Sequence, residues 1–134
     1  MKISTRSRYG LKICQLLAEE YSPNTTLALP YIAEKLSLSE PYLEQLIAIL
    51  KKNGIVCAIR GAGGGYYLSR NPEEITIGDI IRPLEGDFEL NDCLTEGCEN
   101  QSKCKAKSIW KKLYAGINDI LDSMTLKEMI DEEV

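Results

Sequence analysis

The segment Arg60-Gly61-Ala62-Gly63-Gly64-Gly65 limits what the surrounding chain can form, because four glycines in six residues favour neither a helix nor a strand. The short apolar runs on either side, Ile55–Ile59 and Tyr66–Ser69, predict two strands joined by this segment in a β-hairpin. Two helical patterns precede the hairpin, with Ser37-Leu38-Ser39 as a tight connection between them. Ser39 can cap the second helix, whose buried stripe is expected to be Leu43, Leu46, Ile47 and Leu50. Helix, short turn, helix and hairpin, in this order, predict a winged helix-turn-helix.

Helical periodicity also appears on both sides of this unit. A first helix is expected over about residues 5–21, with apolar residues at helical spacing: Tyr9, Ile13, Leu16, Leu17 and Tyr21. Thr76 and Asp79 predict a capping box at the start of a short helix that Pro83 limits or kinks. A final short helix is expected to begin at Thr125, with Glu128 completing a second capping box.

A long helix is expected over roughly residues 104–122. Its apolar residues form one continuous stripe: Ile109, Leu113, Ile117, Ile120 and Leu121, widened by Trp110 and Tyr114. Because such a stripe needs a partner, we expect a homodimer. The fold class is therefore mainly α with a small β-hairpin. We divide it into a winged helix-turn-helix DNA-binding domain (1–85), a cysteine-containing sensor loop (86–103), and a dimerisation helix with a C-terminal helix (104–134).

The net charge of −4 hides an asymmetry between the two halves of the chain. Residues 1–70 hold nine Lys and Arg against five Asp and Glu, whereas residues 71–134 hold seven against fifteen. A basic N-terminal half can face the phosphates of double-stranded DNA while the acidic half faces away. No apolar run approaches the roughly 18 residues of a membrane span, and the N-terminus lacks a signal-peptide core, so we expect a cytoplasmic protein without a membrane partner.

The second helix of the helix-turn-helix would present its first residues to the major groove. Glu44 can accept a hydrogen bond from cytosine and Gln45 can pair with adenine, although an ordinary solvated helix face is the alternative interpretation. Ser39 and Tyr42 suit phosphates, and Pro41 stands between them in the first turn. At the hairpin tip, the cation Arg60 suits a narrow minor groove, and the neighbouring Gly61 allows close approach.

Three of the five cysteines lie in one short polar segment, spaced C-x4-C-x5-C: Cys93, Cys98 and Cys104. A segment this hydrophilic cannot pack as core, so the thiols are expected to serve chemistry. Three thiolates can hold an iron–sulfur cluster or a soft metal ion, and a thiol redox switch without metal is the second possibility. Zinc is the least favoured. Cys14 and Cys57 fall inside predicted elements and are expected to be small buried hydrophobic residues.

The chain contains no His, so the usual general base is absent and a Cys–His nucleophile pair cannot form. We therefore do not expect an enzyme.

Four motifs, in order, resemble the bacterial winged-helix regulators of the IscR, NsrR and CymR type, the Rrf2 family. They are Ser4-Thr5-Arg6-Ser7-Arg8-Tyr9-Gly10-Leu11, Leu38-Ser39-Glu40-Pro41-Tyr42-Leu43-Glu44-Gln45-Leu46, Lys52-Asn53-Gly54-Ile55-Val56 and Arg60-Gly61-Ala62-Gly63-Gly64-Gly65-Tyr66. The resemblance covers nearly the whole chain. It implies a homodimer joined through the long helix, base reading by Glu44 and Gln45, and entry of Arg60 into the minor groove.

The resemblance also implies an iron–sulfur cluster on the three loop cysteines, with [2Fe–2S] favoured over [4Fe–4S]. The chain departs from the relatives at the fourth ligand, because Lys107 stands where some have His and Arg8 where others have Asp. Glu96, Glu99, a small thiol or water could take that position. Relatives of the CymR type lack a cluster and respond through a partner enzyme of cysteine synthesis, which is the alternative for this chain.

Overall fold

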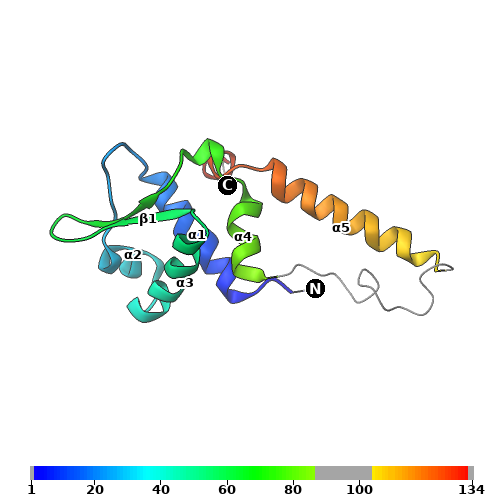
Figure 1. The fold of residues 1–134 in the computed structure, drawn as a ribbon, viewed down its shortest axis with the longest axis horizontal. Coiled ribbons are helices and arrows are strands. Elements are labelled where there is room, and N and C mark those ends of the chain that lie inside the picture. Colours follow the sequence, from blue (N-terminus) through cyan, green and yellow to red (C-terminus); the bar gives the residue numbers. More distant parts are fainter. Residues whose placement is uncertain (1, 87–103, 133–134) are drawn as a thin grey trace.

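Helices and one hairpin make up the computed structural model, which describes residues 2–86 and 104–132 (Figure 1). The elements run α1 (Thr5–Glu19), α2 (Leu29–Leu36), α3 (Glu40–Lys52), β1 (Val56–Ile59), β2 (Gly65–Leu68), the 3₁₀ turn η1 (Pro72–Glu74), α4 (Ile77–Glu85), α5 (Ala106–Ser123) and α6 (Leu126–Asp131). The predicted fold class, mainly α with a small hairpin, is confirmed. No helix within the described ranges is long and apolar enough to cross a membrane.

The helix-turn-helix pair consists of α2 and α3. Ser37 ends α2 in the left-handed conformation (φ 54°, ψ 44°), which turns the chain sharply toward α3. The Ser39 hydroxyl caps α3 by accepting a hydrogen bond from the backbone N–H of Tyr42 at 3.3 Å, as expected from the sequence. Gly54, with φ 75°, follows the end of α3 and leads the chain into the hairpin.

The hairpin is fixed to the rest of the domain through the segment before α2. β1 and β2 pair antiparallel, with Val56 opposite Leu68 and Ile59 opposite Gly65. Leu27 and Tyr66 exchange two backbone hydrogen bonds of 2.9 and 2.8 Å, so residue 27 extends the pairing beyond β2. A Cβ at Gly65 would lie 2.4 Å from the carbonyl oxygen of Leu27, so glycine is required for this approach.

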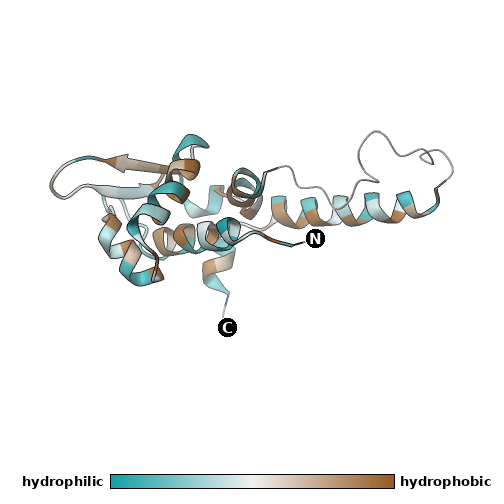
Figure 2. Cartoon of the chain, turned by 90° about the horizontal axis from the view of Figure 1, so that it is seen from below, coloured by the Kyte–Doolittle hydropathy of each residue, from teal (hydrophilic) through white to brown (hydrophobic). Residues whose placement is uncertain are grey.

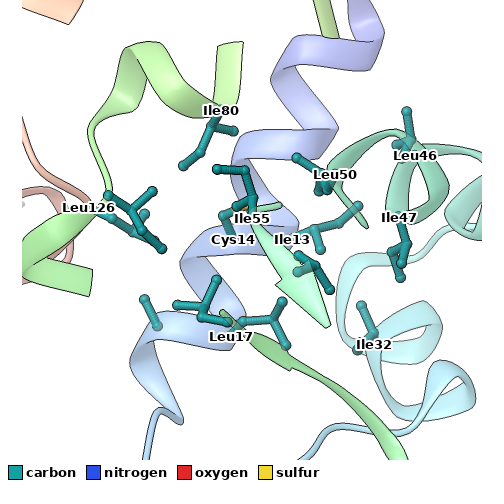
Figure 3. Packing of buried hydrophobic residues seen from close by; sticks show 14 of the residues in the cluster. Ile13, Cys14, Leu17, Ile32, Leu46, Ile47, Leu50, Ile55, Ile80 and Leu126 are labelled. Carbon is teal, nitrogen blue, oxygen red and sulfur yellow. The ribbon is translucent and has the colours of Figure 1, made fainter. Parts of the chain in front are cut away.

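The core lies where α1, α2, α3, α4 and α6 pack together with the hairpin (Figure 3). Fully buried side chains from these elements include Ile13, Leu46, Leu50, Ile80 and Leu126. Helix α1 approaches α4 closely at Gly10, where an added Cβ would lie 2.1 Å from the Leu84 side chain. Both predicted capping boxes are present, Thr76 with Asp79 and Thr125 with Glu128.

Helix α5 extends away from this core as a long arm (Figure 1), and none of its residues is buried. Apolar residues recur along its length in Figure 2. Ile109, Leu113 and Ile120 are each about half exposed, at 52%, 48% and 58%. The inner end of α5 is held against α4 by Arg82, which donates to Asp122 at 2.6 Å and to Asn118 at 2.8 Å.

Candidate nucleic-acid interface

Helix α3 separates its core-facing residues from those available to a ligand. Leu43, Leu46, Ile47 and Leu50 form the buried stripe expected from the sequence. Glu44, Gln45 and Pro41 lie on the exposed side, and Ser39 is also exposed at the N-terminal cap. The candidate base-reading side chains are therefore free of the core.

Tyr42 differs from the other candidates because it is half-buried. Its ring meets that of Tyr9 edge to face, with the centroids 6.2 Å apart. The Lys12 ammonium lies 5.4 Å from the centroid of the Tyr9 ring. Sequence reasoning assigned Tyr42 to phosphates but missed this link, which fixes α3 against α1 and brings the Lys12 cation near it. No local sequence pattern pairs Tyr9 with Tyr42, because they lie in different helices.

The hairpin tip presents Arg60 as an exposed side chain beside glycines that adopt unusual backbone angles. Gly61 and Gly63 have φ values of 96° and 78°, which L side chains rarely adopt. A Cβ at Gly64 would meet the carbonyl oxygen of Ile59 at 2.2 Å. The Thr26 hydroxyl donates to the Gly63 carbonyl at 3.2 Å, so the loop is also tied to the segment before α2.

A hollow of about 450 Å³ connects α3 to the hairpin, and its lining residues come from both elements: Glu44, Ile47, Ala48, Lys51, Lys52 and Tyr66. Glu44 shares this lining with two lysines. Lys51 and Lys52 were not among the predicted interface residues, because their position next to Tyr66 of the hairpin depends on tertiary packing. With the exposed Arg60, these residues supply an acceptor of the kind that contacts base edges and cations of the kind that contact phosphates.

The cysteines fall into two groups. Cys93 and Cys98 lie outside the described residues, whereas Cys104 is exposed two positions before the first residue of α5. Cys14 is fully buried, which confirms the expectation for it, and burial raises the pKa of its thiol to about 12. Cys57 is only half-buried and stands opposite Tyr67 in the hairpin. Within residues 2–86 and 104–132, no three His, Cys, Asp or Glu side chains gather as a metal site would require.

The end of α4, which leads into the cysteine segment, is joined to the start of α1. The Glu85 carboxylate accepts hydrogen bonds from the backbone N–H of Ser4 at 3.0 Å, from the Ser4 hydroxyl at 2.8 Å, and from the buried Ser7 hydroxyl. These bonds, that of Ser7 foremost, lower the pKa of Glu85 below its ordinary value. The contact holds the N-terminal end of α1 against the C-terminal end of α4, the two helices that pack closely at Gly10.

Comparisons with known proteins agree with this geometry. The model of the Rrf2 family, described as an iron-dependent transcriptional regulator, matches residues 3–132. The transcriptional regulator CymR of Bacillus subtilis is 43% identical over 129 residues, which cover 96% of this chain and 89% of that protein.

Two solved structures have the same fold over nearly the whole chain. The structure of CymR, titled the global cysteine regulator of B. subtilis, has a TM-score of 0.82 and 38% identity, with 100% of this chain and 99% of that chain covered. The structure of T. potens IscR has a TM-score of 0.78 and 42% identity, with 98% and 87% covered. The chain therefore belongs to the Rrf2 family of DNA-binding transcriptional regulators, and it is not an enzyme.

Proposed function

We propose that this regulator binds operator DNA as a homodimer, with α3 of each subunit in a major groove and the hairpin tip in the adjacent minor groove. The observation that carries the proposal is the exposure of Glu44 and Gln45 on α3 and of Arg60 at the hairpin tip, with a hollow lined by two lysines joining α3 to Tyr66 of β2. Residues 1–85 then serve as the reader, residues 86–103 as the sensor loop, and residues 104–134 as the dimerisation unit. Ser39, Pro41, Tyr42 and Gly61 complete the candidate DNA contacts.

We further propose that the regulated genes belong to cysteine or sulfur metabolism. The identity of 43% with CymR, whose solved structure is titled a global cysteine regulator, supports this assignment. In this proposal the three-cysteine loop works without a cluster, either as a thiol redox switch or beside a partner enzyme of cysteine synthesis. Two thiols would form a disulfide by giving two electrons and two protons to an oxidant such as peroxide, which becomes water.

An iron–sulfur cluster on Cys93, Cys98 and Cys104 is the second candidate for the signal. The family's description as iron-dependent and the 42% identity with T. potens IscR favour it. Three thiolates fit three of the four protein-ligand positions of a [2Fe–2S] or [4Fe–4S] cluster, with the former favoured. The fourth ligand is not identified, because neither Lys107 nor Arg8 suits iron. Zinc on the same cysteines is the third candidate.

The DNA-binding proposal is tested by selecting an operator from random duplexes and measuring binding of variants across salt concentrations. Arg60→Ala should weaken binding strongly, because it removes the minor-groove cation, and wild-type affinity should fall steeply with salt. Glu44→Ala should relax specificity at one base pair, an effect of about 1–3 kcal/mol.

Arg70→Ala and Glu34→Ala are the matched controls, because both residues are exposed but lie outside the proposed surface. If Arg60→Ala and Glu44→Ala bind operator and scrambled DNA as the controls do, the assigned contacts are wrong.

The candidates for the signal are separated by anaerobic purification, an ultraviolet–visible spectrum, and analysis of iron, sulfide and zinc. A colourless, metal-free protein after anaerobic reconstitution supports the cluster-free proposal. A brown protein with charge-transfer bands and iron matched by sulfide supports the cluster instead.

A further inference from the structure

A second hollow, of about 310 Å³, lies where α1 ends beside the hairpin. Three parts of the chain enclose it: the end of α1 with Glu20 and Tyr21, the turn of residues 22–27, and the hairpin with Ile59 and Tyr66. Its volume is at the lower end of the range for small-molecule sites, roughly 300–1,000 Å³. No step of the proposed DNA recognition uses it.

The walls of this hollow are held by hydrogen bonds that need no ligand. The backbone N–H of Thr25 donates to the Ser22 carbonyl at 3.2 Å, and the hydroxyls of the same two residues are hydrogen-bonded. Asn24 completes this turn in the left-handed region, with φ 68°. The two backbone bonds between Leu27 and Tyr66 then fix the turn to the hairpin. The hollow is therefore preformed, as ligand sites usually are.

The chemistry of the lining selects the kind of ligand. Apolar walls come from residues such as Leu17, Leu27 and Ile59, and hydroxyl groups come from the tyrosines and from the turn. Glu20 is the one carboxylate among the lining residues, and they include no Lys or Arg. An anion would therefore meet a carboxylate without a compensating cation, whereas an ammonium group would find a counter-charge, acceptors and aromatic rings.

We propose that this hollow binds a small organic amine, with its ammonium group at the Glu20 carboxylate and its apolar body against Ile59 and Tyr66. Glu20 lines both this hollow and a neighbouring one that includes Tyr31, whose hydroxyl donates to one Glu20 carboxylate oxygen at 2.6 Å. The site shares Tyr66 with the hollow beside α3 but includes none of the assigned operator contacts. The hollow is lined by Ile59, directly before Arg60, and by residues of β2, so a bound amine should change the amide chemical shifts of β2.

The test uses the full chain and three probes with a common phenyl-alkyl skeleton: 2-phenylethylamine, 2-phenylethanol and 3-phenylpropionate. Amide chemical shifts are followed by nuclear magnetic resonance at pH 7 during titration. The amine should shift amides of residues 20–22, 24–27 and 66–69 saturably, the alcohol should bind more weakly, and the carboxylate should leave these amides unchanged.

Glu20→Gln should lower the affinity for the amine about fivefold, the upper end of the range for one solvent-accessible charge pair. Glu19→Gln is the matched control, because it removes the same charge one residue away, from a side chain outside the lining. Tyr31→Phe should weaken amine binding less than Glu20→Gln, because it removes a hydrogen bond to the carboxylate but keeps the charge.

Absence of saturable shifts with the amine would overturn the proposed site, and equal binding of the three probes would overturn the selection for a cation. Equal losses in Glu19→Gln and Glu20→Gln would overturn the role of Glu20. Operator binding is measured separately, so the result for amine binding can be interpreted even if the protein does not bind the operator.

Discussion

At the scale of single residues, the Glu85 carboxylate accepts the hydrogen bonds that span the greatest sequence separation among the described residues. It receives its hydrogen bonds from Ser4 and Ser7, about 80 positions earlier in the chain. The Ser4 hydroxyl also caps α1 by accepting from the Ser7 N–H at 3.2 Å. One carboxylate thus holds the N-terminal end of α1 to the last residue of α4.

We predict that Glu85 makes folding stability dependent on acid pH. Its folded pKa lies below the ordinary value of 4.5, so near that pH the unfolded chain binds more protons than the folded protein. The contribution is fully present above about pH 4.5 and is lost as the pH falls through the lowered folded value.

Urea unfolding of wild type and Glu85→Gln at one protein concentration, from pH 7 to pH 3, measures this effect. The difference in unfolding free energy should be largest at pH 7 and should shrink through the acid range. Glu34→Gln, an exposed carboxylate on α2, should show no such convergence. Parallel curves for wild type and Glu85→Gln would contradict the prediction.

Local residue patterns explain which of these features the sequence could predict. The caps at Ser39, Thr76 and Thr125 depend on residues three positions apart, and all three are present as expected. The contacts of Glu85 with Ser7 and of Tyr42 with Tyr9 join residues far apart in sequence. Only packing determines such neighbours, so periodicity and capping rules could not identify them.

At the scale of elements, the apolar stripe expected on α5 has an exposed part and a half-buried part, the latter with Ile117 and Leu121. Ile109, Leu113 and Ile120 recur at helical spacing on one side and are about half exposed. Asn118 and Asp122, which bond Arg82 of α4, lie on the opposite side of the helix. Sequence periodicity predicted the helix and its apolar character, but the position of α4 determines which part of the stripe is left for a partner.

We predict that the exposed part of this stripe joins two copies of the chain. Leu113→Glu combined with Ile120→Glu should give monomers or aggregates in analytical ultracentrifugation, because carboxylates would be buried at the centre of the contact. These positions test the interface better than Ile117 and Leu121, which are half-buried in the single chain.

Ala115→Glu is the matched control for the dimer, because it adds a carboxylate to the other side of the same helix. This variant should remain dimeric. An unaltered dimer in the double variant would exclude the stripe as the interface.

At the scale of the whole molecule, the cysteine segment connects α4 to α5 along the chain, and α5 is the helix proposed to join two copies. It follows Glu85, which is anchored to α1, and it ends at Cys104, just before α5. Arg82 holds the inner end of α5 to α4. A covalent or metal link within the segment would therefore act on the start of α5 relative to a fixed α4.

Such a link can change DNA affinity because a dimeric reader must place its two recognition helices at the spacing of the half-sites. The family, the fold and the exposed side of α3 followed from sequence motifs and periodicity. The hollow beside α3 did not, because its residues come from two elements that meet only after folding. The proposed link between signal and DNA would likewise arise only in the assembled dimer.

We predict that the number of cysteines required for the response identifies its chemistry. Each single Cys→Ala variant at positions 93, 98 and 104 is tested for operator binding after peroxide treatment and after anaerobic iron and sulfide loading. A disulfide needs two thiols, so a redox switch should be lost in two variants and kept in the third. A cluster needs all three as ligands, so all three variants should then behave as apo protein.

Cys14→Ala and Cys57→Ala should respond like wild type in both treatments, because neither thiol belongs to the proposed sensor loop. Cys14 is in addition held uncharged at neutral pH, since burial raises the pKa of its thiol to about 12. If wild type binds every operator equally before and after both treatments, the loop does not set DNA affinity. If all three loop variants keep a full response, the response reaches the DNA-binding domain by another route, such as the partner enzyme of cysteine synthesis.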